Sequence, residues 1–360
     1  MKKPAVSRFI GCLVGGAIGD ALGYPVEFAK SEGEIQRVLS ATTPTHLPRA
    51  KSGKAIVSDD TQMTLFTAEG LLRARQRSIE RGICSTEVVL LRAYQRWLST
   101  QGAEQANNRW TGEQRGWLLD VPELHAARAP GNTCLSALHE SLTRDGSCPS
   151  TARPPNDSKG CGAVMRSAPI GLAASSIEEA FELARDAAVL THGHPSGYLA
   201  AAYFAAMIFE IARDVELATA LDHADVLLAK QSDHLETRRA VIRARDVARL
   251  SSKASRDELE SLGQGWVAEE SLAIAVYCAL TASRDHVADA LYVSVAHAGD
   301  SDSTGSMTGN LLGAMWGIEA FPAAWINDVE LRETTEQLGC DLHDTFVRGE
   351  RPDEKRYPPN

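Results

Sequence analysis

Apolar side chains recur at helical spacing along most of this sequence. No region shows the sustained alternation of β-branched and polar residues that marks a half-buried strand. One helix is marked by Leu65, Leu71 and Leu72, and the next by Val88, Leu91, Tyr94 and Leu98. Further helices are predicted over residues 177–190, 198–211, 215–228, 235–250, 271–280, 286–296 and 304–318. The pattern predicts an all-α fold.

The helical pattern continues through the chain without a clear interdomain linker or an internal repeat. A length of 360 residues is enough for one large core. We therefore predict a single domain over residues 1–360, with its core from about residue 9 to about residue 345. Three long loops, where prolines and glycines gather, are predicted over 41–57, 109–131 and 144–162. Long loops inside a compact domain often carry function.

The charge balance argues against two classes of partner. The net charge is −10, so we expect neither nucleic-acid binding nor binding to an anionic membrane surface as the main task. The basic runs Arg238-Arg239 and Arg243-Ala244-Arg245 are interpreted as a solvated helix face. We find no apolar stretch of bilayer-spanning length, and interpret the glycine-containing run from Phe9 to Ile18 as a buried first helix.

The cysteines indicate a reducing environment. There are seven of them at irregular spacing, and no CxxC pair occurs. Neither a disulfide framework nor a zinc knuckle is expected from such a set. We predict a cytoplasmic location.

Two short clusters combine paired carboxylates with hydroxyls. They are Ser58-Asp59-Asp60-Thr61 and Asp300-Ser301-Asp302-Ser303-Thr304-Gly305. Carboxylates this close repel one another unless a cation lies between them. All their side-chain donors are oxygen, the ligand that Mg²⁺ and Mn²⁺ prefer. If the fold brings the clusters together, the result is a two-metal site.

Each cluster also has a simpler interpretation. The first precedes an apolar-periodic stretch, so one of its residues can serve as a helix N-cap, and capping and metal binding stay open for it. The second begins like an EF-hand loop, but the twelfth position is Leu311, which leaves that loop without its bidentate acid.

Four weaker motifs have default structural roles. Residues 19–27 break a helix with glycines and end on Glu27, and residues 158–166 form a glycine-rich turn that is no Walker A loop. His192 and His194 are two residues apart, so they share no helix face and a zinc site is not expected. Residues 265–270 are interpreted either as an element at the rim of a substrate site or as a helix start with acids in its first turn, and we favour the helix start for Glu270.

In this order, the motifs resemble those of the ADP-ribosylglycohydrolase family, which includes the dinitrogen-reductase-activating glycohydrolase and ADP-ribosylarginine and ADP-ribosylserine hydrolases. The resemblance runs from about Phe9 to Gly317. The segments that carry it are GDALGYPVEF, SDDTQ, PGNTCLSAL, KGCGAVMR, THGHPSGY, GWVAEESL and HAGDSDSTGSMTGNLLGA. Together they are specific, although each alone is weak.

The resemblance implies a compact orthogonal helix bundle with two Mg²⁺ or Mn²⁺ ions in a central cleft. It assigns the metal ligands to Ser58, Asp59, Asp60, Asp300, Asp302 and Ser303. It assigns catalysis to Glu27, Asp59, Asp60 and Asp302. The ADP-ribose contacts that it implies are Lys159, Gly160, Cys161, Gly162 and Met165 at the diphosphate, His192 and Tyr198 on the ribose and adenine side, and Gly131 and Thr133 at the distal ribose.

The function implied is hydrolysis of ADP-ribose from modified protein side chains, with arginine as the expected linkage and an ADP-ribosylated protein as the partner. Two alternatives stay open: an immunity protein that neutralises an ADP-ribosyltransferase toxin, and a non-catalytic ADP-ribose-binding relative. The chain departs from the family where an acid often precedes Gly-Asn-Thr, because Ala129-Pro130 stand there. The choice of acid–base residue and the linkage therefore stay open.

Overall fold

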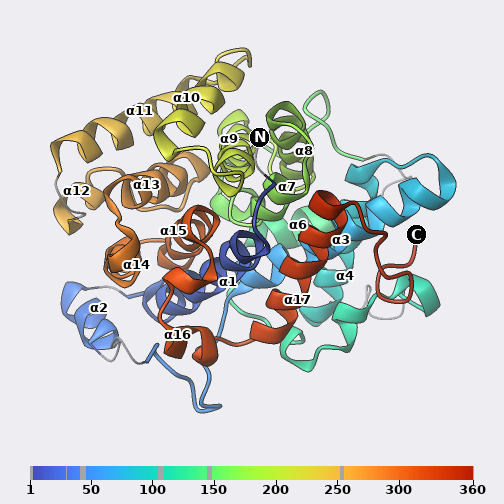
Figure 1. The fold of residues 1–360 in the computed structure, drawn as a ribbon, viewed down its shortest axis with the longest axis horizontal. Coiled ribbons are helices and arrows are strands. Elements are labelled where there is room, and N and C mark those ends of the chain that lie inside the picture. The colour runs from blue at the N-terminus through green and yellow to red at the C-terminus, as the bar shows by residue number, and fades with distance from the viewer. Residues whose placement is uncertain are drawn as a thin grey trace.

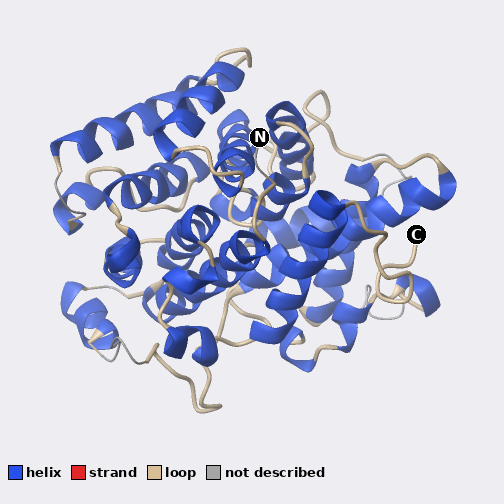
Figure 2. Ribbon diagram, viewed as in Figure 1, coloured by secondary structure: helices blue, strands red, loops and turns tan. Residues whose placement is uncertain are grey.

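A computed structural model describes residues 3–29, 31–40, 46–103, 109–143, 148–251 and 255–359. Over these residues the chain is helical and forms no strand, which confirms the all-α prediction (Figure 2). The helices are α1 Val6–Gly23, α2 Glu32–Leu39, α3 Asp59–Arg81, α4 Thr86–Thr100, α6 Asn132–Ser141, α7 Ala168–Ala173, α8 Ile177–Val189, α9 Pro195–Ala212, α10 Leu217–Leu228, α11 Leu235–Leu250, α12 Arg256–Glu260, α13 Ala268–Thr281, α14 Val287–Val295, α15 Ser301–Trp316, α16 Ala323–Asp328 and α17 Arg332–His343.

Side-chain caps and turn residues explain several helix boundaries. The Ser176 hydroxyl accepts a hydrogen bond from the Glu179 backbone N–H at the start of α8, and Ser31 does the same for Glu34 at α2. Helix α3 ends at Gly82, whose φ of 68° is a left-handed conformation that glycine adopts without cost. The predicted loop over 109–131 contains short 3₁₀ turns, while 41–45 and 144–147 of the other two loops lie outside the described residues.

Helices α1 and α15 cross at the centre of the molecule in direct backbone contact (Figure 1). Glycines recur every four residues on both helices and so line one face of each. A Cβ added at Gly19 would overlap the Gly305 carbonyl, and one added at Gly309 would overlap the Gly15 carbonyl. The pairing runs antiparallel, from Gly11 with Gly313 to Gly23 with Ser301. It therefore places the first turn of α15 beside the last turn of α1.

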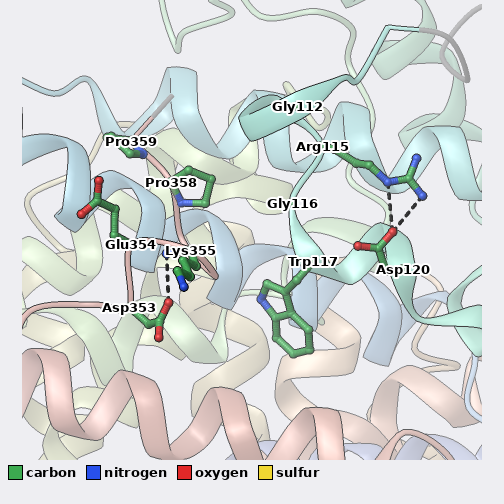
Figure 3. Close-up of a pocket in the computed structure, with 10 residues that line it drawn as sticks. All are labelled: Gly112, Arg115, Gly116, Trp117, Asp120, Asp353, Glu354, Lys355, Pro358 and Pro359. Carbon is green, nitrogen blue, oxygen red and sulfur yellow. Dashed lines mark hydrogen bonds and ion pairs between the residues drawn. The ribbon is translucent and has the colours of Figure 1, made fainter.

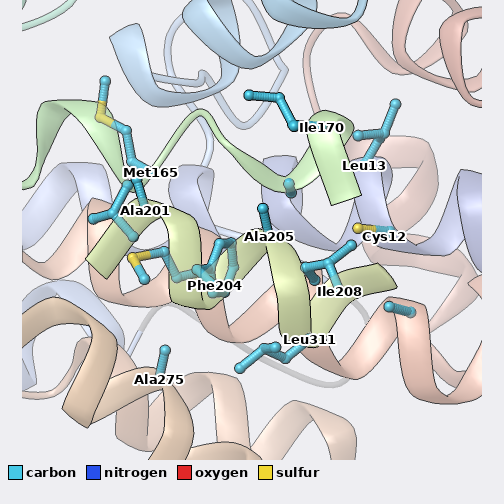
Figure 4. Packing of buried hydrophobic residues seen from close by; sticks show 14 of the residues in the cluster. Cys12, Leu13, Met165, Ile170, Ala201, Phe204, Ala205, Ile208, Ala275 and Leu311 are labelled. Atoms are coloured by element: carbon cyan, nitrogen blue, oxygen red, sulfur yellow. The ribbon is translucent and has the colours of Figure 1, made fainter. Parts of the chain in front are cut away.

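Helix α9 fills the core next to this crossing. Its small residues let neighbouring helices approach closely, and Ala201, Phe204, Ala205 and Ile208 pack among side chains from α1, α7, α13 and α15 (Figure 4). Two helical segments, Val6–Val26 and Pro195–Ala212, are long and apolar enough to cross a membrane by length and composition, so our statement about apolar length was wrong. In the structure 83% and 89% of them is buried against the rest of the chain, and buried core helices pass the same test.

We predict that Gly309→Ala destabilises the fold by at least about 1–3 kcal/mol, because the added methyl group must push two packed helix backbones apart. Gly33→Ala is the matched control: it lies within α2, and its Cβ would meet no atom within 4 Å. The control should be neutral or stabilising by up to about 1 kcal/mol. Urea denaturation of both variants measures the difference, and equal stabilities would contradict close backbone contact at Gly309.

Candidate active site

One cleft, with a volume of about 200 Å³, gathers side chains from segments far apart in the sequence. The turn after α1 contributes Glu27, the first turn of α3 contributes Asp59 and Asp60, and the start of α15 contributes Asp300 and Asp302. The two acidic clusters of the sequence therefore meet in one cleft. The described residues that line it are Glu27, Asp59, Asp60, Ala129, Gly131, Asn132, Thr133, Cys134, Gly160, Cys161, Gly162, Met165, His192, Trp266, Asp300, Asp302 and Ser303.

Both acidic clusters lie at helix N-termini. Ser58 is the N-cap of α3, and its hydroxyl accepts a hydrogen bond from the Asp60 backbone N–H at 3.2 Å. Asp59 and Asp60 then fill the first turn of α3, as Asp302 does in α15. The positive end of each helix dipole favours these carboxylates. The capping interpretation of Ser58 is thus correct, and it coexists with two acids that face the cleft.

Asp20 holds the acidic end of α3 against α1. Its carboxylate accepts hydrogen bonds from the Ser58 backbone N–H at 2.9 and 3.0 Å, from the Thr61 backbone N–H at 3.1 Å and from the Thr61 hydroxyl at 2.5 Å. The side chain is fully buried. Burial, followed by the charge of Asp302, raises the pKa of Asp20 to about 7. Asp20 thus joins α3 to α1 and does not itself line the cleft.

Negative charge in the cleft has no basic counterpart, since none of its described lining residues is Lys or Arg. Burial raises the pKa values of Asp59 and Asp60 well above their ordinary range, and the charge of Asp302 adds to both. Burial, with the charges of Asp302 and Asp300, raises the pKa of Glu27 to about 10. Carboxylates crowded in this way favour protonation or a bound cation.

The donors in the cleft fit hard divalent cations. Asp60 Oδ2 and Glu27 Oε2 are buried and have no hydrogen-bond partner, and such oxygens are the ligands that Mg²⁺ and Mn²⁺ prefer. In the described part of the chain, no group of three His, Cys, Asp or Glu side chains lies close enough together to hold an ion. The fit therefore rests on donor chemistry and on the two unpartnered oxygens.

A thiol reaches one of these carboxylates. Cys161, in the glycine loop of residues 159–162, donates a hydrogen bond to Asp300 Oδ2 at 2.6 Å. Its sulfur accepts a longer one from the Ser303 hydroxyl at 3.5 Å. Burial, with the charge of Asp300, raises the pKa of the Cys161 thiol well above its ordinary value. Cys161 is therefore a neutral hydrogen-bond donor and no activated thiolate.

The glycine loop lies against His192. A Cβ at Gly160 or Gly162 would lie 3.4 Å from His192 Nε2, and one at Gly162 would also lie 2.9 Å from the sulfur of Cys134. The contact at Gly160 is an ordinary one, but at Gly162 an added Cβ would crowd Cys134 and His192. Burial, with the charge of Arg166, lowers the pKa of His192 to about 3. The imidazole that faces the loop is therefore neutral at pH 7.

The segment before α13 fixes the other side of the loop. The Cys161 backbone N–H donates to the Trp266 carbonyl at 3.2 Å, and the Ala268 N–H donates to the Lys159 carbonyl at 2.8 Å. Trp266 lines the cleft, in keeping with the substrate-rim interpretation that the sequence left open for this motif. Glu270 has a structural role at the helix start, because its carboxylate accepts hydrogen bonds from the backbone N–H groups of Gln264 and Gly265.

Three residues assigned to the site by resemblance do not line the cleft: Ser58, Lys159 and Tyr198. The Lys159 ammonium instead pairs with Glu269 at 2.7 Å and with Glu236 at 3.1 Å. Gly131 and Thr133 do line it; the Gly131 N–H donates to Asp59 Oδ2 at 3.4 Å, and the Thr133 hydroxyl lies 3.1 Å from that of Ser158.

A larger cavity, of about 880 Å³, lies between the 112–120 segment and the C-terminal residues 353–359 (Figure 3). Arg115 and Asp120 form an ion pair there at 3.0 Å, and Trp117 forms part of the wall. None of the crowded carboxylates lines this cavity. The candidate site is therefore the smaller, acidic cleft.

Comparison with known proteins defines the class to which this fold and cleft belong. The sequence model of the ADP-ribosylglycohydrolase family matches residues 1–352. The chain therefore belongs to that family, as the ordered motifs predicted. A solved structure of an ADP-ribosylglycohydrolase-related protein complex superposes with a TM-score of 0.62 at 25% identity, covering 94% of this chain and 97% of that one.

Three relatives show the range of activities named within the family. The chain is 28% identical to mouse ADP-ribosylhydrolase ARH3, over 95% of this chain and 92% of the relative. It is 25% identical to the ADP-ribosyl-[dinitrogen reductase] glycohydrolase of Rhodospirillum rubrum, over 92% and 94%. It is also 25% identical to ADP-ribosylarginine hydrolase Tri1 of Pseudomonas putida, over 95% and 79%.

We predict that buried His192 makes the fold acid-sensitive. In the unfolded chain the pKa of the His192 imidazole is near its ordinary value of 6.5, but in the folded chain this pKa is about 3. Between these values the unfolded chain binds more protons, so stability falls as pH falls, by up to about 1.4 kcal/mol per pH unit. His192→Gln should lose less stability than wild type between about pH 6 and pH 4, measured by urea denaturation. The exposed His139→Gln should follow wild type, and parallel pH profiles for all three proteins would contradict the prediction.

Proposed function

We propose that this chain is a metal-dependent hydrolase that removes ADP-ribose from modified protein side chains, with ADP-ribosylarginine as its first substrate. The observation that carries the proposal is the set of carboxylates in the cleft that lack a basic partner, next to a glycine loop. The family supports hydrolysis of ADP-ribosyl groups. The names of two relatives, the ADP-ribosylarginine hydrolase and the dinitrogen reductase glycohydrolase, support the finer proposal.

Two divalent cations would be held by Asp59 and Asp60 from α3 and by Asp300, Asp302 and Ser303 from α15. When bound, such ions would make water a stronger acid and would accept ribose hydroxyls as ligands. The carboxylates that remain around the anomeric carbon favour the positive charge that develops there as the glycosidic bond breaks. Mg²⁺ and Mn²⁺ both suit this set of oxygen donors.

Glu27 is our candidate for proton transfer. Its carboxyl is buried at the edge of the cleft, Oε2 has no partner, and burial is the largest cause that raises its pKa, which favours the protonated form. It can therefore hold a proton for the departing side chain and recover one from the attacking water. The loop backbone of Gly160 and Gly162, beside neutral His192, offers an uncharged wall against which a diphosphate can bind.

The alternatives receive less support. The comparisons do not support a toxin partner, and the crowded carboxylates argue against a non-catalytic ADP-ribose-binding relative. We also propose a cytoplasmic location, supported by seven cysteines that form no disulfide.

We predict that wild type releases ADP-ribose from an arginine-ADP-ribosylated protein with Mg²⁺ or Mn²⁺, and that a chelator abolishes release. Asp302→Ala should lose metal binding by calorimetry and about 100-fold or more in turnover, because it removes a ligand from the centre of the acid cluster. Asp285→Ala removes an exposed aspartate from η6 (Arg284–His286) and is the control for charge. Full turnover of Asp302→Ala in chelator would refute the metal-dependent mechanism.

We predict that Lys159 positions the glycine loop and does not bind substrate directly. Its ammonium ties the loop to Glu236 of α11 and Glu269 of α13. Lys159→Met should therefore raise KM for the arginine-linked substrate about tenfold and change kcat little. Lys159→Arg should restore KM, and the exposed Lys230→Met should behave as wild type. A fall in kcat with unchanged KM would contradict this role.

A further inference from the structure

Helix α11 has an outer face that mixes exposed aliphatic and basic side chains. Leu235 is 53% exposed, Ile242 43% and Leu250 88%. Helical spacing places Arg239 and Arg243 on the same side as these three residues. We call these five residues the α11 face. The exposed Asp246 lies on the same side and pairs with Arg249. In Figure 1 the helix lies at the outer edge of the molecule beside α10.

The fold does not use these side chains. Helix α11 is anchored through its opposite side, where Thr237, Val241 and Ala244 are buried, and it packs mainly on α13. The α11 face therefore exposes apolar surface that stabilises nothing in the described structure. Exposed apolar patches with a polar rim mark interaction sites, and arginine is enriched at protein interfaces.

The charge of this helix opposes that of the whole chain. Residues 235–250 contain five arginines, one glutamate and one aspartate, a net charge of +3 in a protein of net charge −10. Arg245 is paired with Asp222 and Asp225, and Arg249 with Asp246. Within the described ranges, no acidic group pairs with Arg239 or Arg243. Two unneutralised guanidinium groups thus flank Ile242.

The α11 face begins beside the candidate active site. Glu236, in the first turn of α11, accepts hydrogen bonds from Lys159 at 3.1 Å and from the Ser196 hydroxyl at 2.6 Å. Lys159 starts the glycine loop whose other residues line the cleft. The 16 residues of α11 extend about 24 Å from that point. A polypeptide whose modified residue occupied the cleft could therefore run along this helix.

We propose that the α11 face is a docking surface for the protein part of the substrate, and that it binds an acidic segment that also carries aliphatic side chains. This inference rests on the proposed function. The acidic residues pair with Arg239 and Arg243, and the aliphatic ones cover Leu235 and Ile242. A protein segment fits better than a nucleic acid, because α11 contains no aromatic side chain on which bases could stack.

The test uses two arginine-ADP-ribosylated peptides that differ in one flank, which contains glutamate and leucine in one peptide and glutamine and leucine in the other. Arg239→Glu/Arg243→Glu should raise KM for the glutamate peptide about fivefold and leave KM for the glutamine peptide unchanged. Arg75→Glu/Arg92→Glu makes the same change in charge on α3 and α4, and its KM for both peptides should equal that of wild type. Ile242→Ser should weaken the binding of both peptides. Ile79→Ser, at a residue with a similar exposure of 42%, should leave their binding unchanged.

Fluorescence anisotropy of the unmodified peptides measures docking without catalysis. If neither modified peptide is cleaved but the glutamate peptide binds wild type more tightly than the Arg239→Glu/Arg243→Glu variant, docking stands and the proposed function fails. If both peptides are cleaved with equal KM by all variants, the function stands and docking is overturned. Docking is also overturned if single-stranded RNA displaces the bound glutamate peptide more effectively than that peptide itself, or if wild type forms a dimer that the Arg239→Glu/Arg243→Glu variant abolishes.

Discussion

The contact between the backbones of α1 and α15 is the interaction on which the rest of this structure depends. Gly15 and Gly19 meet Gly309 and Gly305 with no side chain between them, so the two helices lie closer than ordinary core packing allows. That closeness brings the start of α15 to the end of α1 and hence Asp302 into the cleft that Glu27 lines. The helices around the pair, α9 and α13 among them, complete a core that keeps it buried.

A second constraint joins α3 to this pair, at a cost in stability. Asp20 extends from α1 and accepts the first backbone N–H groups of α3, which fixes Asp59 and Asp60 in position. The resulting group of buried acids destabilises the fold, because each charge must be desolvated next to like charges. A protein that retains such a group at its centre sacrifices stability for a binding site. The neutral Cys161 and His192 beside the acids add no compensating positive charge.

The sequence allowed much of the fold to be predicted, because helical periodicity is a local signal. The helices expected over 177–190 and 235–250 differ from the observed α8 and α11 by at most one residue at either end. The acidic clusters were found because their residues are neighbours in the chain. The role of the segment around Trp266 stayed open, because its place in the cleft depends on a backbone pairing with the glycine loop. The Lys159 side chain points away from the cleft because its ammonium bonds Glu236 and Glu269. These two residues are 77 and 110 positions away in the sequence, so no local pattern indicates the contact.

The four-residue repeat of glycines along α1 and α15 also fixes the register between the two helices. A slide of one residue would drive a side chain such as Val14 or Leu312 into the opposing backbone, so the nearest alternative match is a full step of four residues. Such a step moves α15 by about 6 Å along its axis and carries Asp300 and Asp302 out of the cleft. The separation between the two acidic clusters is therefore discrete. A molecule has its carboxylates in place or lacks the site altogether, and no gradual adjustment of this crossing can tune the distance between them.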